Sequence, residues 1–124
     1  MHKTRQELFD NAVSQMKKQD WKQSHGIFMR MGKKPGEGVL CLYRDFKNNR
    51  KCAIGANIPD EKYQRRMEGR NARSINVRAA AGIRAKDLEF ADKLQSAHDH
   101  SYTPKDMRLS FKSLAERYDL KFNP

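Results

Sequence analysis

The sequence predicts a single α+β domain over residues 1–124, in which a β-hairpin packs on three main helices and one short helix. Residues 39–43 and 51–55 are predicted strands around a turn at Asn48 and Asn49, because asparagine tolerates the positive φ of tight turns. Apolar residues recur at helical spacing near both ends of the chain. A length of 124 residues fits one domain with one modest core.

The first helix is predicted over residues 5–19. Thr4 and Glu7 have the spacing of a capping box. One face carries apolar residues at helical spacing: Leu8, Phe9, Ala12, Val13 and Met16. We expect Trp21 to pack back on the core.

Residues 27–31 form a short apolar run that is a candidate third strand. Residues 32–38 contain three glycines, one proline and two lysines, which is the composition of a loop. The loop lacks the GxxxxGK[ST] spacing of a nucleotide-phosphate loop. We therefore expect an ordinary basic loop here.

The two cysteines do not make a disulfide scaffold. With the turn at Asn48 and Asn49, Cys52 faces Asp45. A turn at residues 46–47 would instead place Cys41 opposite Cys52. In the intracellular setting that the sequence favours, both cysteines are predicted to be reduced and buried.

The short helix is predicted to start at Pro59 and to end at Gly69, which fits a left-handed C-cap. Residues 74–77 are a further strand candidate or an extended loop, and residues 78–82 are a weak helix or a turn. A helix is predicted from Lys86 to about His98. The last helix begins with Thr103 as the N-cap, and residues 120–122 are expected to pack on the core as an extended tail.

Charge is the strongest compositional signal. The chain carries 26 Lys and Arg against 15 Asp and Glu, a net charge of +11. Residues 44–74 hold nine of the basic and four of the acidic side chains. A clustered excess of cations attracts polyanions, because binding releases counterions. The predicted nucleic-acid-binding residues are Lys62, Arg65, Arg66, Arg70 and Arg73, supported by Arg44, Arg50 and Lys51.

Tyr43 and Phe46 lie near the predicted turn. Exposed rings there would stack on bases, whereas packing in the core is the alternative. No helix-turn-helix, zinc-finger or RNP signature is present, so sequence-specific reading of DNA is not predicted.

His98, Asp99 and His100 are the residues most typical of an enzyme site. On a helix, neighbours one or two apart do not share a face, so a role in fixing the helix end is favoured over metal binding. The carboxylates near the short helix, Asp60, Glu61 and Glu68, are better explained by capping and by neighbouring arginines. No catalytic residue, metal site or cofactor is therefore predicted.

The sequence contains no apolar run of roughly 18 residues, which is the length that a membrane span needs. The N-terminus leads into an amphipathic helix and not into a signal peptide. We therefore expect a soluble cytoplasmic protein with no membrane partner.

Several short motifs occur in a distinctive order. They are Tyr43-Arg44, Lys51-Cys52-Ala53-Ile54-Gly55, Ile58-Pro59-Asp60-Glu61, Tyr63, Met67-Glu68-Gly69, Leu94-Gln95 and Ala97-His98-Asp99. In these motifs the chain resembles a group of small, mostly uncharacterised proteins of tailed bacteriophages and prophages, over about residues 8–120. Asn57 and the arginine-rich residues 64–66 and 70–73 depart from the group's pattern. The resemblance implies a protein of the host cytoplasm that acts on nucleic acid or on a host machine.

The sequence thus favours a small non-enzymatic protein that binds the DNA or RNA backbone through phosphate contacts. The alternative is an inhibitor or modulator that docks on an acidic surface of a host nuclease, polymerase or defence complex. A metal-dependent nuclease that uses His98 and Asp99 is a third, weaker alternative.

Overall fold

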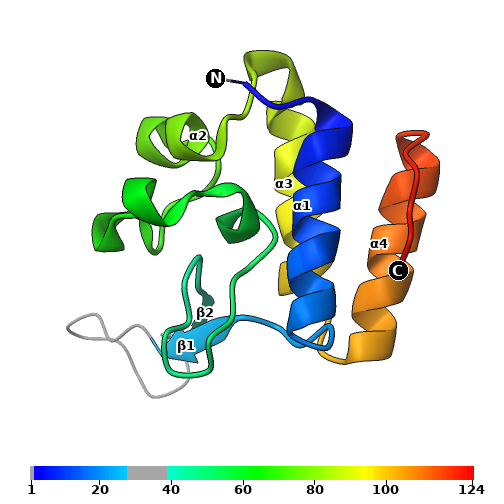
Figure 1. The fold of residues 1–124 in the computed structure, drawn as a ribbon, viewed down its shortest axis with the longest axis horizontal. Coiled ribbons are helices and arrows are strands. Elements are labelled where there is room, and N and C mark those ends of the chain that lie inside the picture. The colour runs from blue at the N-terminus through cyan, green and yellow to red at the C-terminus, as the bar shows by residue number, and fades with distance from the viewer. Residues whose placement is uncertain (1, 28–38) are drawn as a thin grey trace.

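Four α-helices form most of the regular structure in residues 2–27 and 39–124, which are the residues that the computed structural model describes (Figure 1). The helices are α1 (Arg5–Lys18), α2 (Ile75–Ala81), α3 (Leu88–Asp99) and α4 (Pro104–Arg117). Four short 3-10 turns accompany them: η1 (Gly55–Asn57), η2 (Asp60–Lys62), η3 (Arg65–Met67) and η4 (Ala85–Asp87). Strand β1 (His25–Ile27) pairs antiparallel with β2 (Val39–Cys41), with Gly26 opposite Leu40.

The α+β prediction is wrong, because the described residues are mainly helical and the expected hairpin is not formed. β2 pairs with β1 and not with residues 51–55. An isolated bridge between Asp45 and Arg50 lies in the segment between the two predicted strands. After that bridge, the backbone N–H groups bond to side chains and not to a neighbouring strand. The Lys51 N–H donates to the amide oxygen of Gln19 at 2.9 Å, and the Ile54 N–H donates to that of Gln95 at 3.0 Å.

The predicted first and last helices are confirmed. The Thr4 hydroxyl accepts from the Glu7 backbone N–H at 3.1 Å, and the Thr4 N–H donates to the Glu7 carboxylate at 2.9 Å, so the capping box is complete. Thr103 caps α4 by accepting from the Asp106 N–H at 3.1 Å, with Pro104 in the first turn. Local side-chain chemistry fixes both helix starts.

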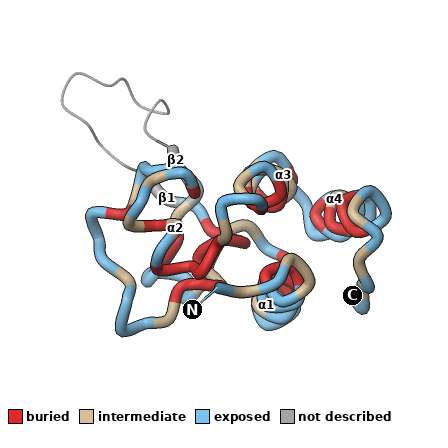
Figure 2. The backbone as a smooth tube through the Cα atoms, turned by 90° about the horizontal axis from the view of Figure 1, so that it is seen from above, coloured by how far each residue is buried: buried red, intermediate tan, exposed pale blue. Residues whose placement is uncertain are grey.

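The core lies between the facing sides of the helices and the irregular segment that includes Cys52, Ala53 and Ile54, and Figure 2 shows buried residues in both. The ring of Phe9 contacts Phe111 at a centroid distance of 5.9 Å, and Trp21 contacts Phe111 at 5.5 Å. Phe122, from the tail after α4, lies 5.7 Å from Phe9. The predicted positions of Trp21 and of the C-terminal tail are thus confirmed.

Two predictions in the middle of the chain are wrong. The helix expected from Pro59 to Gly69 is replaced by the separate turns η2 and η3, although Gly69 does have a positive φ of 80°. Residues 75–77 belong to α2, with Ser74 as its N-cap, and not to a strand. Contacts with a distant segment close the end of α2, since the Lys3 ammonium donates to the Ala81 carbonyl at 2.7 Å.

Within residues 2–27 and 39–124, every helix is too short or too polar to pass through a bilayer. The predicted strand residues 28–31, the glycine-rich loop 32–38 and the side chain of Cys41 lie outside the described part of the structure. Cys52 is buried as a free thiol, as predicted.

Candidate polyanion-binding surface

The eight predicted cationic side chains do not form one group. Arg44 is buried, Arg50 and Lys51 are partly buried beside the turn at residues 46–49, and the other five are exposed. Each group has different partners, and these partners decide which side chains are able to meet a polyanion.

Arg44 has a structural role. Its guanidinium, only 5% exposed, donates to the Gly55 carbonyl at 2.6 Å, to the Ile58 carbonyl and to the Asp60 carboxylate at 3.2 Å. It also lies 5.1 Å from the centre of the Tyr63 ring. Because these internal hydrogen bonds occupy the guanidinium, its burial argues against the predicted binding role of Arg44.

Glu68 joins the segment before the turn to the segment after η3. Its carboxylate accepts from the backbone N–H groups of Tyr43 and Arg44 at 2.9 and 3.1 Å, and from the Tyr63 hydroxyl at 2.7 Å. Burial and the bond to Glu68 raise the pKa of Tyr63. These internal hydrogen bonds therefore explain the glutamate of the Met67-Glu68-Gly69 motif.

Arg50 and Lys51 line a hollow of about 260 Å³ together with Phe46, Tyr63 and Asp60. Lys51 lies 3.7 Å from the Asp60 carboxylate, and Arg50 donates to the Gln23 carbonyl at 3.3 Å. Both cations reach the surface, but Asp60, whose side chain is 85% exposed, offsets part of their charge. Phe46 is 77% exposed, whereas Tyr43 is 4% exposed and belongs to the core.

Four exposed cations lie on η2, η3 and the residues that follow. We call Lys62, Arg65, Arg66 and Arg70 the basic edge. None of the four forms an ion pair with a carboxylate within residues 2–27 and 39–124. In Figure 1 the green η turns that carry this edge lie on the opposite side of the molecule from α4.

Contacts bring members of the basic edge together. Lys62 and Arg66 line one hollow of about 440 Å³ with Gln64, Asn76 and Glu61, whose carboxylate offsets part of their charge. The guanidinium of Arg70 donates to the Arg66 carbonyl at 3.2 Å, which holds the two arginines side by side. Asn76 was missed from the sequence, because residues 74–77 were predicted as a strand or an extended loop and nothing local placed them beside η2.

Arg73 is removed from this group by an ion pair. Its guanidinium lies 2.8 Å from the Asp92 carboxylate on α3, and both side chains are partly exposed. An exposed pair of this kind is worth only about 0–1 kcal/mol, so phosphate is able to compete for Arg73. It is nevertheless a weaker candidate than the basic edge.

His98 is buried and has a structural role, as predicted. Its Nε2 accepts from the Ser24 backbone N–H at 3.0 Å, and its Nδ1 lies 2.9 Å from the Asp99 carboxylate. This pattern assigns the proton to Nδ1. The part of the chain that the structure describes contains no group of three or more His, Cys, Asp or Glu side chains arranged to hold a metal ion.

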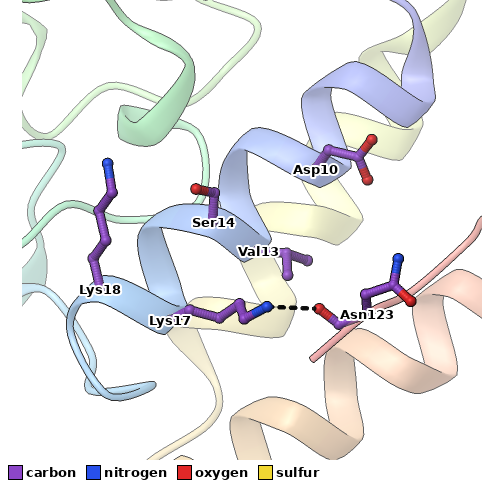
Figure 3. Close-up of a pocket in the computed structure, with 6 residues that line it drawn as sticks. All are labelled: Asp10, Val13, Ser14, Lys17, Lys18 and Asn123. Carbon is purple, nitrogen blue, oxygen red and sulfur yellow. Dashed lines mark hydrogen bonds between the residues drawn. The ribbon is translucent and has the colours of Figure 1, made fainter.

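A further hollow, of about 370 Å³, lies between α1 and the C-terminal tail. Figure 3 shows Lys17 and Lys18 at this hollow, with the Lys17 ammonium donating to the Asn123 carbonyl at 3.3 Å. Asp10 offsets part of the charge, and the lining contains no aromatic side chain. With two lysines against the four cations of the basic edge, this hollow is the weaker candidate for a polyanion site.

Comparisons with protein-family models, with curated proteins and with solved structures find no match to this chain. The resemblance to small phage proteins remains a prediction. The fold and surface define a small, mainly helical domain with one strongly basic edge.

Proposed function

We propose that the protein is a small non-enzymatic nucleic-acid-binding protein of the cytoplasm, the host cytoplasm if it is phage-encoded, that grips phosphates with its basic edge. The observation that carries this proposal is the exposure of Lys62, Arg65, Arg66 and Arg70 without an ion pair in the described residues. Arginine suits this task, because its planar guanidinium binds phosphate oxygens in pairs.

The proposed binding is electrostatic and independent of sequence. Each phosphate contact releases condensed counterions, so the logarithm of the binding constant falls with the logarithm of salt by roughly 0.7–0.9 per contact. Four contacts at the basic edge thus predict a slope of about −3, with Arg50 and Arg73 adding to it.

The test compares two variants of equal net charge. In the first, the basic edge is changed to Gln at positions 62, 65, 66 and 70. In the second, four exposed cations of α4 are changed to Gln: Lys105, Arg108, Lys112 and Arg117. Binding to labelled DNA and RNA is followed by fluorescence anisotropy at several salt concentrations.

We expect the edge variant to lose most of the affinity and most of the salt slope, and the α4 variant to keep both. Equal losses in the two variants would mean that net charge alone causes binding. No binding by the natural chain at low salt would refute the proposal. Capture of one stoichiometric host protein from nuclease-treated lysate, with loss in the edge variant, would instead support docking on an acidic protein.

A further inference from the structure

Phe46 is an exposed aromatic ring beside the proposed nucleic-acid surface. It is 77% exposed, and the other exposed large apolar side chains of the described residues are Ile75, Tyr102 and Leu109. Phe46 alone among these four lines a hollow with Arg50 and Lys51. An exposed ring next to cations is the combination that single-stranded nucleic acid favours.

The turn that carries Phe46 is held by specific hydrogen bonds. The backbones of Asp45 and Arg50 exchange two hydrogen bonds of 2.8 and 3.0 Å across it. The Asp45 carboxylate accepts from the backbone and side-chain amides of Asn48 at 3.2 and 2.9 Å. The ring is therefore presented by a defined turn, and little conformational entropy is lost when a ligand binds it.

The ring of Tyr63 packs against Phe46. Tyr63 meets it edge to face, with centroids 5.8 Å apart and ring planes at 68°. Tyr63 is itself fixed by its bond to Glu68 and by the Arg44 guanidinium beside its ring. Phe46 therefore packs against a side chain, Tyr63, that is itself held in place by Glu68 and Arg44.

We infer that Phe46 stacks on an unpaired base, so that the partner of this surface is single-stranded nucleic acid. The inference rests on the proposed function and specifies its substrate class. Bases within a duplex are covered by their neighbours and cannot lie on the ring, whereas every unpaired base offers a face to it. Arg50 and the basic edge then supply phosphate contacts to the same strand.

The experiment measures binding to short labelled oligo(dT) and to a duplex of the same length, with three variants of Phe46. Phe46→Ala removes the ring, Phe46→Leu keeps apolar volume without an aromatic face, and Phe46→Trp keeps the face. Tyr102→Ala is the control, because Tyr102 is 80% exposed and does not line the hollow at Phe46. Circular dichroism checks that each variant is folded.

We expect Phe46→Ala and Phe46→Leu to weaken oligo(dT) binding by roughly 5-fold or more, with unchanged duplex binding. Phe46→Trp and Tyr102→Ala should keep the affinity, and oligo(dT) should quench the new indole, since Trp21 is buried. Unchanged oligo(dT) binding by the Leu variant, or equal losses for single strand and duplex, would overturn the inference. Neither result would affect the proposed phosphate contacts, whereas absence of any binding by the natural chain would refute both.

Discussion

Gly55 lies in direct backbone contact with Tyr43, since a Cβ atom at position 55 would come within 2.3 Å of the Tyr43 carbonyl oxygen. The same hypothetical atom would lie 2.9 Å from the Tyr43 carbonyl carbon. Every other amino acid would force the two segments apart. This contact replaces the strand pairing that the sequence predicts here, and it explains the glycine at the end of the Lys51–Gly55 motif.

Gly55→Ala is expected to lower the free energy of unfolding by roughly 3 kcal/mol or more, because the clash is with backbone atoms that have no alternative rotamer. Gly69→Ala is the comparison, since its positive φ of 80° costs only about 1 kcal/mol. Urea denaturation followed by circular dichroism measures both. A cost at position 55 no larger than at position 69 would contradict the close contact.

Arg44→Lys is expected to destabilise the fold by roughly 2 kcal/mol, because the two terminal nitrogens of the guanidinium reach the carbonyls of Gly55 and Ile58 separately. Lysine has one nitrogen and lacks this planar fork, so it cannot reproduce both bonds in the same geometry. Arg66→Lys is the matched control on the exposed basic edge and should leave stability within about 0.5 kcal/mol. The measurement is again urea denaturation. Equal effects of the two substitutions would show that Arg44 is not held as described.

Asp60→Asn is expected to strengthen nucleic-acid binding by about 2–5-fold at low salt, since it removes a carboxylate that is 3.7 Å from Lys51 and 85% exposed. The salt dependence should become steeper as Lys51 becomes available for phosphate. Anisotropy titrations check this, with Glu116→Gln on α4 as the control. A fall in affinity in a folded Asp60→Asn protein would place the binding surface elsewhere.

His98→Phe is expected to cost roughly 2 kcal/mol, because the buried Ser24 N–H would lose its acceptor. His98→Gln should recover part of this loss, since its amide oxygen lies near the place of Nε2 and accepts a hydrogen bond. Thermal or urea unfolding measures both variants. Nucleic-acid binding by the folded variants should stay unchanged, whereas its loss would give His98 a functional role.

Cys52 should resist thiol reagents in the native state. Burial raises the pKa of its thiol to about 12, although the hydrogen bond from the Gly55 N–H acts to lower this pKa. The thiolate is the reactive form, so labelling at about pH 8 should be limited by opening of the fold. In Cys41→Ser, where Cys52 is the remaining thiol, labelling should be slow in buffer and fast in denaturant. Rapid native labelling would contradict its burial.

Local signals in the sequence were enough to predict α1 and α4. Thr4 and Thr103 supply caps, and an unbroken apolar face follows each of them, so neither helix depends on distant residues for its start. The packing of Trp21 also followed from the sequence. A large apolar side chain directly after an amphipathic helix is expected to be buried, and a domain of this size has a single core.

Residues 39–77 could not be predicted in the same way. Cys52, Ala53 and Ile54 are all buried, and a short buried apolar run has no periodicity that separates a strand from a compact turn. The compact turn is stabilised by Gln19, at the end of α1, and Gln95, on α3, because their side chains accept hydrogen bonds from its backbone. Such partners are distant in sequence and carry no local signal.

The amino-acid sequence was enough to establish the excess of positive charge, its concentration in residues 44–74, and the helices capped by Thr4 and Thr103. Which of these cations reach solvent depends on how the chain folds. Arg44 and Arg66 are the same residue type in the same segment, yet internal carbonyls surround the first and solvent surrounds the second. Burial depends on contacts between residues that are distant in sequence, and composition does not reveal those contacts.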